Sequence, residues 1–255
     1  MFPMLESLDP FVIAVASIAF FLGGLLKGVI GMGMPLVAIP LIATVMPVTQ
    51  AIPLMVAPGY IMNLIQMRQA WHARMPLLTW WPLFLGMAVG VVVGVYFATS
   101  APERLLRGVL GGTVVVFVLL SFARVELPAR HVENPAAGLT MGGVTGLFGG
   151  LTGVFGPTLA MYFLARRLEK DRFVWIMAVL MFSGVTFLSG SLTAAGNFSQ
   201  AQLLGTLGVL LPSWLGLTAG AWVRGRVSQN IFRRVALTAL LVMGISLLVA
   251  SLGWT

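Results

Sequence analysis

Long apolar runs separated by short clusters of charge cover the whole chain. Ten such runs lie at residues 11–30, 34–46, 51–66, 76–99, 104–122, 136–150, 155–166, 173–195, 202–223 and 231–251. A helix needs roughly 20 apolar residues to cross the hydrocarbon core of a bilayer. The pattern therefore predicts an all-α, polytopic integral membrane protein with about 8–10 membrane segments.

The second and the seventh runs are too short to cross a bilayer alone as straight helices. Each follows a glycine-rich stretch, GVIGMGMP before the one and GGLTGVFGP before the other. Glycine lets the backbone turn, and proline suits the first turn of a helix, where its missing N–H needs no partner. We expect two broken or re-entrant helices, which unwind at Gly31–Gly33 and at Gly153–Gly156. The new helices are expected to begin at Pro35 and Pro157.

Two ordered blocks of glycine and proline recur along the chain. Gly24, Gly28, Gly31 and Pro35 recur at an offset of 122 residues as Gly146, Gly150, Gly153 and Pro157. Pro82, Gly86 and Gly90 recur at an offset of 130 residues as Pro212, Gly216 and Gly220. Glycines four residues apart are also a common packing pattern of membrane helices, but prolines in both blocks favour a duplication. Residues 1–255 are thus predicted to form a single transmembrane domain with internal repeats at 11–122 and 136–251.

Composition and charge set the environment and the orientation. The chain is 59% hydrophobic and 9% charged, with a mean hydropathy of +1.01, whereas soluble domains carry about 25% charged residues. The net charge of +8 is best explained by basic loops held on the cytoplasmic side, so no nucleic-acid partner is expected. The predicted cytoplasmic loops contain Arg68, His72 and Arg74; Arg166, Arg167, Lys170 and Arg172; and Arg224, Arg226, Arg233 and Arg234.

The remaining loops predict that the two repeats are inverted relative to each other. The N-terminus, the Met46–Gln50 turn, the Gly196–Gln202 loop and the tail contain no Lys or Arg, which places both termini outside the cytoplasm. The run at 34–46 then ends outside the cytoplasm, while its repeat partner at 155–166 ends in the cytoplasm. The turn with Glu103, Arg104 and Arg107 is an exception, because this topology puts its net positive charge outside.

Missing residue types exclude several chemistries. The chain has no cysteine, and its two histidines, His72 and His131, lie in predicted loops, so no metal site, cofactor or enzymatic nucleophile–base pair is expected. The seven carboxylates are Glu6, Asp9, Glu103, Glu126, Glu133, Glu169 and Asp171, all in termini or loops. Cation-coupled pumps usually place Asp or Glu inside the membrane. A small anion is therefore the favoured substrate, with the bilayer as the other partner.

The restarted helices are the first candidate site. A helix start presents N–H groups without intrahelical partners and about half a positive charge, which suits an anion. The alternative is that the breaks only permit tight packing or a kink. Lys27 lies just before the first break; it either helps to collect anions or reaches the lipid headgroups.

Polar residues within two apolar runs are the second candidate. Asn63 and Gln66 lie three residues apart and so share a helical face, and Ser183, Thr186 and Ser189 form a stripe in the equivalent segment of the second repeat. These groups either line a cavity rich in hydroxyls and amides, or the hydroxyls bond to carbonyls of their own helix or to a neighbouring helix. The predicted substrate-binding residues are Lys27, Gly31, Gly33, Met34, Asn63, Gln66, Thr152, Gly153, Gly156, Thr158, Ser183 and Thr186.

The paired motifs KGVIGMGMPLVAIPL and GGLTGVFGPTLAMYFL resemble those of the sulfite exporter TauE/SafE family of bacterial membrane proteins. The resemblance covers essentially the whole chain. It implies a transporter of the inner membrane, built from two inverted repeats, that moves small sulfur-containing or organic anions such as sulfite, sulfonates or sulfoacetate. An anion channel or a structural membrane subunit remains the alternative, and the sequence leaves open whether the chain works alone or as a homodimer.

Overall fold

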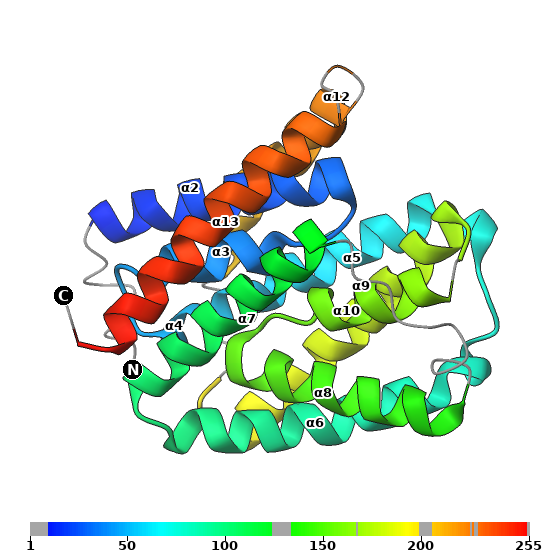
Figure 1. The fold of residues 1–255 in the computed structure, drawn as a ribbon, viewed down its shortest axis with the longest axis horizontal. Coiled ribbons are helices and arrows are strands. Elements are labelled where there is room, and N and C mark those ends of the chain that lie inside the picture. Colours follow the sequence, from blue (N-terminus) through cyan, green and yellow to red (C-terminus); the bar gives the residue numbers. More distant parts are fainter. Residues whose placement is uncertain are drawn as a thin grey trace. The chain divides into compact units, whose positions relative to one another are not determined.

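A computed structural model of the chain describes residues 10–123, 134–166, 168–198, 206–224, 226 and 229–253. Across these residues the regular structure is helical throughout, without any strand. Within the same residues, seven stretches are long and apolar enough to cross a membrane. The chain is thus an all-α, polytopic membrane protein, as the pattern of apolar runs predicts (Figure 1).

The α-helices in chain order are α2 (Pro10–Ile30), α3 (Met34–Ile42), α4 (Val48–Ala51), α5 (Val56–Gln69), α6 (Trp81–Ser100), α7 (Glu103–Ala123), α8 (Pro135–Thr152), α9 (Gly156–Ala165), α10 (Lys170–Ala194), α12 (Leu210–Arg224) and α13 (Gln229–Ser251). Short 3-10 helices occur at η1 (Pro53–Met55), η2 (Trp71–Ala73), η3 (Leu77–Trp80) and η5 (Thr206–Val209).

Prolines account for the main departures from the predicted segments. The segment predicted at 51–66 lies within a stretch, Val48–Gln69, that is long and apolar enough to span a membrane. It is built from α4, η1 and α5 in succession, because Pro53 begins η1 and a proline cannot donate an intrahelical hydrogen bond. Likewise η3 precedes α6 in the segment predicted at 76–99. The run predicted at 34–46 ends as a helix at Ile42. Part of the run at 202–223 lies outside the described residues.

The chain divides into two compact units, each assembled from separate stretches of sequence. Unit 1 comprises residues 1–58, 102–118 and 199–255, and unit 2 comprises residues 59–101 and 119–198. Each break lies in a different unit: the break between α2 and α3 in unit 1, and the break between α8 and α9 in unit 2.

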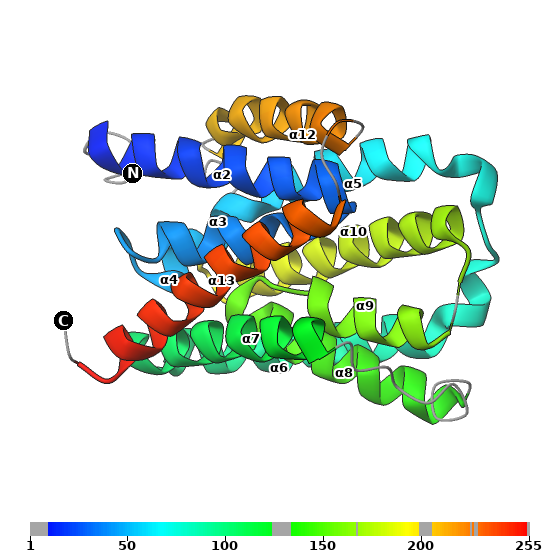
Figure 2. The same ribbon diagram turned by 45° about the horizontal axis from the view of Figure 1, so that its top comes forward.

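In unit 1, glycines bring α2 and α12 into backbone contact along much of their length (Figure 2). Gly24 and Gly28 of α2 lie against α12, and Gly216 and Gly220 of α12 lie against α2. A side chain at any of these four positions would meet backbone atoms of the other helix. Such small-residue contacts let two membrane helices pack where lipid offers no hydrophobic driving force. Helix α3 folds back against α2, and Gly111 of α7 contacts α13.

In unit 2, glycines bring α6 and α8 into the same kind of backbone contact, and the two helices lie side by side in Figures 1 and 2. Gly86, Gly90 and Gly94 of α6 contact the α8 backbone, and Gly146 and Gly150 of α8 contact the α6 backbone. Helix α6 also exposes large apolar side chains, which are those of Trp81, Leu85, Val89, Val92, Val93, Tyr96 and Phe97. An exposed apolar surface of this kind suits a helix that faces lipid.

The glycine contacts join the two recurring blocks of the sequence crosswise. Gly24 and Gly28 belong to the first block of the N-terminal half and contact α12, in the C-terminal half. Their counterparts Gly146 and Gly150 belong to the C-terminal half and contact α6, in the N-terminal half. Each unit therefore combines a broken helix from one half of the sequence with a glycine-faced helix from the other half.

Candidate functional site

The first break interrupts the helix over three residues. Gly31 has φ 94° and Gly33 has φ 98°, left-handed values that favour glycine. The Gly31 N–H donates to the Lys27 carbonyl at 2.7 Å and closes α2, while Gly33 caps α3 without a capping side chain. Pro35 occupies the first turn of α3. The predicted unwinding over Gly31–Gly33 is present, and the new helix begins at Met34, one residue before the position predicted.

Lys27 is buried within this first broken helix. It lies in the last turn of α2 and is 4% exposed, and Met34, which begins α3, is buried as well. A side chain this deeply enclosed does not extend to lipid headgroups, so the structure disfavours the headgroup alternative for Lys27. Lys27 has a partner within the protein, and its role in anion binding stays a prediction.

At the second break, the chain turns at a single residue with left-handed backbone conformation. Gly153 has φ 74°, and its N–H donates to the Gly149 carbonyl at 2.8 Å, which closes α8. Helix α9 then begins at Gly156, one residue before the predicted Pro157. Buried Thr152 ties the two sides of the turn, because its hydroxyl donates to the Phe148 carbonyl at 2.6 Å and accepts from the Val154 N–H at 3.3 Å.

A pair of threonines joins α8 to the start of α9. The hydroxyls of Thr145 and Thr158 lie 2.7 Å apart, and Thr158 also reaches the Phe155 carbonyl at 3.4 Å. Thr145 is fully buried, and Thr158 is partly buried. The bond holds the first turn of α9 against the middle of α8, so the break is an ordered structure with defined partners.

Phe155 fills the space at this break. Its ring packs directly on Gly149 of α8 and lies beside Gly184 of α10. A side chain in place of either glycine would meet the ring. The break, α8 and α10 are therefore packed around one aromatic side chain, which positions the start of α9 within unit 2.

The polar residues of α5 and α10 adopt two kinds of arrangement. Asn63 and Gln66 are 4% and 8% exposed, which agrees with the expectation that they face the protein interior. Ser183 donates to the Val179 carbonyl at 3.0 Å and Thr186 to the Phe182 carbonyl at 3.0 Å, both within α10. Thr186 is also exposed. Ser183 and Thr186 thus follow the alternative in which hydroxyls bond to their own helix.

Tyr60 and Ser189 link α5 to α10 within unit 2. The two hydroxyls lie 2.9 Å apart, and the Tyr60 ring packs edge-on against Phe182 with centroids 5.1 Å apart. Ser189 also donates to the Thr186 carbonyl at 3.2 Å. Tyr60 can therefore donate its proton to Ser189, while Ser189 donates along its own helix.

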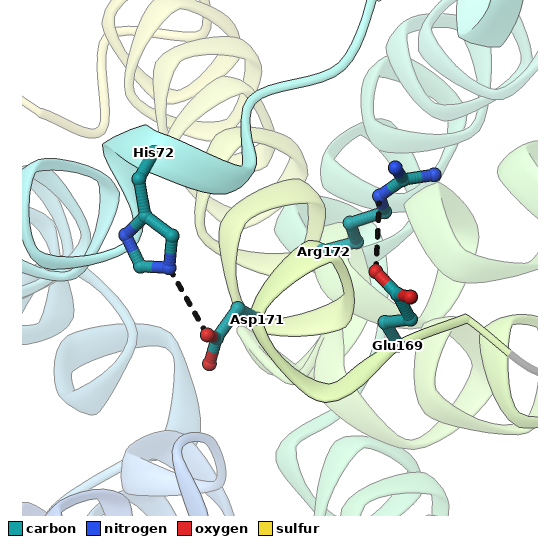
Figure 3. A network of polar contacts seen from close by, with 4 residues as sticks. All are labelled: His72, Glu169, Asp171 and Arg172. Carbon is teal, nitrogen blue, oxygen red and sulfur yellow. Dashed lines mark hydrogen bonds and ion pairs between the residues drawn. The ribbon is translucent and has the colours of Figure 1, made fainter.

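Two basic loops meet at one end of unit 2 (Figure 3). The His72 Nε2 lies 3.0 Å from Asp171 Oδ2, and Arg172 pairs with Glu169 at 3.4 Å. Both pairs are exposed, and exposed pairs contribute little to stability. Arg166 lies over the rings of Trp80 and Tyr162 at the same loop. The contact between the loops around His72 and Asp171 agrees with their predicted location on the same membrane side.

A similar contact in unit 1 concerns the turn that the topology prediction treats as an exception. The Val48 N–H donates to Glu103 Oε1 at 2.9 Å, and Arg107 Nε lies 3.0 Å from the same oxygen. Gly253 lies beside the Arg104 guanidinium. The turn at Glu103, the turn at Val48 and the tail thus share one end of unit 1, as the topology requires. The carboxylate of Glu103 offsets the charge of Arg107.

No group of three or more potential metal ligands of the His, Cys, Asp and Glu types occurs among the residues that the structure describes. Glu126, His131 and Glu133, which belong to the loop predicted from sequence, lie outside those residues.

Comparison with known families agrees with this architecture. The family model for the sulfite exporter TauE/SafE matches residues 16–247, which is most of the chain. The chain belongs to the sulfite exporter TauE/SafE family. No curated protein and no solved structure matches the chain significantly. Membership supports a membrane exporter of sulfite or a related anion, a family of transporters rather than enzymes.

In this TauE/SafE protein, the residues predicted to bind substrate fall in both units. Lys27, Gly31, Gly33 and Met34 belong to unit 1, and the others, Asn63, Gln66, Thr152, Gly153, Gly156, Thr158, Ser183 and Thr186, belong to unit 2. Within unit 2, Thr152, Gly153, Gly156 and Thr158 lie together at the break. Their role in binding stays a prediction.

Sequence reasoning missed two polar residues of unit 2. Thr145 is the hydrogen-bond partner of Thr158. It lies seven residues before Thr152 and so on the same face of α8, and this spacing could have identified it from the sequence. Trp175 is buried near the start of α10. The sequence contains no comparable signal for Trp175, because an apolar helix near a membrane surface often includes tryptophan.

Proposed function

We propose that this protein is a secondary transporter that exports small organosulfur or other organic anions, such as sulfite, sulfonates or sulfoacetate, across the bacterial inner membrane. The anion binds near the midplane, where the two restarted helices begin. The two sequence repeats have inverted topology, and both termini lie on the periplasmic side.

One observation carries this proposal: each unit contains a helix that breaks at left-handed glycine and restarts with proline in its first turn. Discontinuous helices of this kind commonly form the substrate sites of secondary transporters, because their N-termini point at anionic groups. The crosswise pairing of the recurring glycine blocks supports a duplicated architecture.

The charge distribution supports an anion as the substrate. Among the residues that the structure describes, the buried polar side chains are those of Lys27, Asn63, Gln66, Thr145, Thr152, Thr206 and Ser213, with no carboxylate among them. A potential that is negative inside drives an anion outward with about 2.3 kcal/mol per charge per 100 mV. Export therefore needs no coupled cation.

Flux through proteoliposomes tests the proposal. Purified protein is reconstituted into vesicles loaded with radiolabelled sulfite, methanesulfonate or sulfoacetate, and efflux is followed against protein-free vesicles under an imposed potential. We expect saturable efflux of at least one anion, accelerated when the interior is negative. Absence of flux for all three anions from folded protein contradicts the proposal. Discrete single-channel currents in planar bilayers would instead favour the anion channel.

A further inference from the structure

The connection between α12 and α13 is strongly basic and contains no acidic residue. Residues 224–234 include four arginines, Arg224, Arg226, Arg233 and Arg234, and neither Asp nor Glu. This segment joins two stretches that are long and apolar enough to span a membrane, Thr206–Val223 and Arg234–Ser251. The four positive charges therefore lie together at a membrane surface, at one end of unit 1.

The carboxylate that could neutralise these arginines lies at the other end of unit 1. Among the described residues of that unit, Glu103 is the only acidic one, and it already accepts from Arg107 and from the Val48 N–H. The neighbouring Arg104 lies beside Gly253, just beyond α13. Arg234 precedes Ser251, the last residue of α13, by 17 residues, which is about 26 Å along the helix axis.

The basic loop of unit 2 shows the opposite arrangement. There Arg172 pairs with Glu169, and His72 pairs with Asp171, so the loop provides carboxylates for its own positive charges. The described residues of unit 1 provide none at the basic end. An anion from outside the protein is therefore the natural partner of this end.

Trp222 holds the guanidinium group of Arg226 in place. The Arg226 Cζ atom lies 3.8 Å from the centre of the Trp222 ring, while the other arginine–aromatic contacts of the described residues measure 5.0–5.6 Å. The Arg226 N–H also donates to the Val223 carbonyl at 2.9 Å. Stacking uses the flat face of the guanidinium group, and its N–H groups point outward in the plane. The stack thus presents ordered donors to a phosphate.

The stack lies on the side of α12 that faces away from α2. Gly216 and Gly220 mark the side that contacts α2. Leu211, Leu215 and Trp222 follow one another at spacings of four and seven residues, so they share another face, and all three are exposed. An exposed tryptophan at the end of such an apolar face is typical of the membrane interface. Arg226, which is exposed as well, therefore lies at the level of the lipid headgroups.

Arg234 provides a second exposed cation near this surface. It lies in the second turn of α13, and it precedes exposed Ile245 by eleven residues, which places both on one face of the helix. Helix α12 ends five residues before α13 begins, so the two helix ends lie within about 17 Å of each other. A long arginine side chain extends from such a position towards the membrane surface.

We propose that Arg226, held on the Trp222 ring, and Arg234 bind the phosphate of an anionic phospholipid at this end of unit 1. Arginine recognises phosphate through parallel N–H···O bonds, and basic clusters beside membrane helices attract anionic lipids. The acyl chains of the lipid cover the exposed apolar face of α12. The position of the stack above a lipid-facing side favours a phospholipid over a dissolved anion. This inference does not depend on which anion the protein transports.

Native mass spectrometry of the purified protein in detergent measures the affinity for phosphatidylglycerol, with phosphatidylcholine as the uncharged reference. We expect wild type to prefer phosphatidylglycerol. Arg226→Gln and Arg234→Gln are each expected to weaken its binding about fivefold, as the loss of one basic group near a membrane surface does. Trp222→Leu keeps an apolar side chain but removes the stack, and it is expected to weaken binding as well. The lipid-free Tm of these surface variants is expected to match wild type.

Arg172→Gln is the matched control, because it removes the same charge from an exposed arginine that pairs with Glu169. It is expected to retain the affinity of wild type for phosphatidylglycerol. Equal weakening in Arg172→Gln and Arg226→Gln would reduce the effect to general charge attraction and overturn the site. Unchanged affinity in Arg226→Gln also overturns it. Displacement of phosphatidylglycerol by inorganic phosphate would identify a site for dissolved anions and contradict the lipid assignment.

Discussion

Gly28 of α2 and Gly220 of α12 pack so closely that a methyl group on Gly28 would lie 2.8 Å from the Gly220 Cα atom. The contact joins two residues that are far apart in sequence and come from opposite halves of the chain. Its counterpart in unit 2 joins Gly150 of α8 and Gly94 of α6 in the same way. Backbone contact of this kind leaves no room for any side chain, which makes it a sensitive point of the fold.

Gly220→Ala is expected to lower the stability of the protein. Its methyl group would collide with the Leu25 carbonyl and lie 2.9 Å from the Gly28 Cα atom, so α2 and α12 must separate. Overpacking of a tight contact costs about 1–3 kcal/mol, which thermal unfolding in detergent measures as a lower Tm. Gly112→Ala is the control, since no atom lies within 4 Å of a methyl group there. An equal loss in both variants contradicts the packing argument.

Gly31→Leu and Gly153→Leu are expected to abolish anion efflux while the protein still inserts in the membrane. Both glycines have positive φ, and a leucine there is strained by about 1–2 kcal/mol or more, so the break changes shape. Gly196→Leu is the matched control, because Gly196 has φ 73° with open space around it. Wild-type efflux in both break variants would remove the breaks from the mechanism.

Thr145→Val and Thr158→Val are expected to destabilise unit 2 by similar amounts, about 0.6–2 kcal/mol each. Each variant removes one member of the 2.7 Å hydroxyl pair that joins α8 to α9. The double variant is expected to lose little more than either single variant, since the shared bond is lost once. Thr140→Val is the control on α8, because Thr140 is exposed and bonds to its own helix. Additive losses would show that the pair does not act as a unit.

Two exposed glutamines test the predicted orientation in the membrane. Gln50 lies in the turn predicted to be periplasmic, and Gln69 lies beside the basic loop predicted to be cytoplasmic. Because the chain has no cysteine, Gln50→Cys and Gln69→Cys can be labelled with a membrane-impermeant maleimide without background. We expect labelling of Gln50→Cys in spheroplasts with an intact inner membrane, and of Gln69→Cys only after permeabilisation. The reverse pattern would invert the topology.

Local features of the sequence are sufficient to predict the class of this protein and the location of its breaks. Apolar runs of spanning length have only helices available to them in lipid, because every backbone N–H and C=O must be satisfied within the segment. Gly31, Gly33 and Gly153 mark the breaks because left-handed backbone favours glycine, and Pro35 follows because the first turn tolerates a missing N–H. These preferences are local, so they can be read from neighbouring residues.

Which residues contact one another depends on how the helices pack in three dimensions. A glycine at four-residue spacing predicts close approach but not the partner, so the crosswise pairing of α2 with α12 could not be predicted from the spacing alone. The burial of Lys27, the bonds of Ser183 and Thr186 within their own helix, and the unsatisfied indole of Trp175 likewise depend on surrounding helices. Hydrogen-bond satisfaction and burial are properties of contacts distant in sequence, and periodicity along one helix does not specify them.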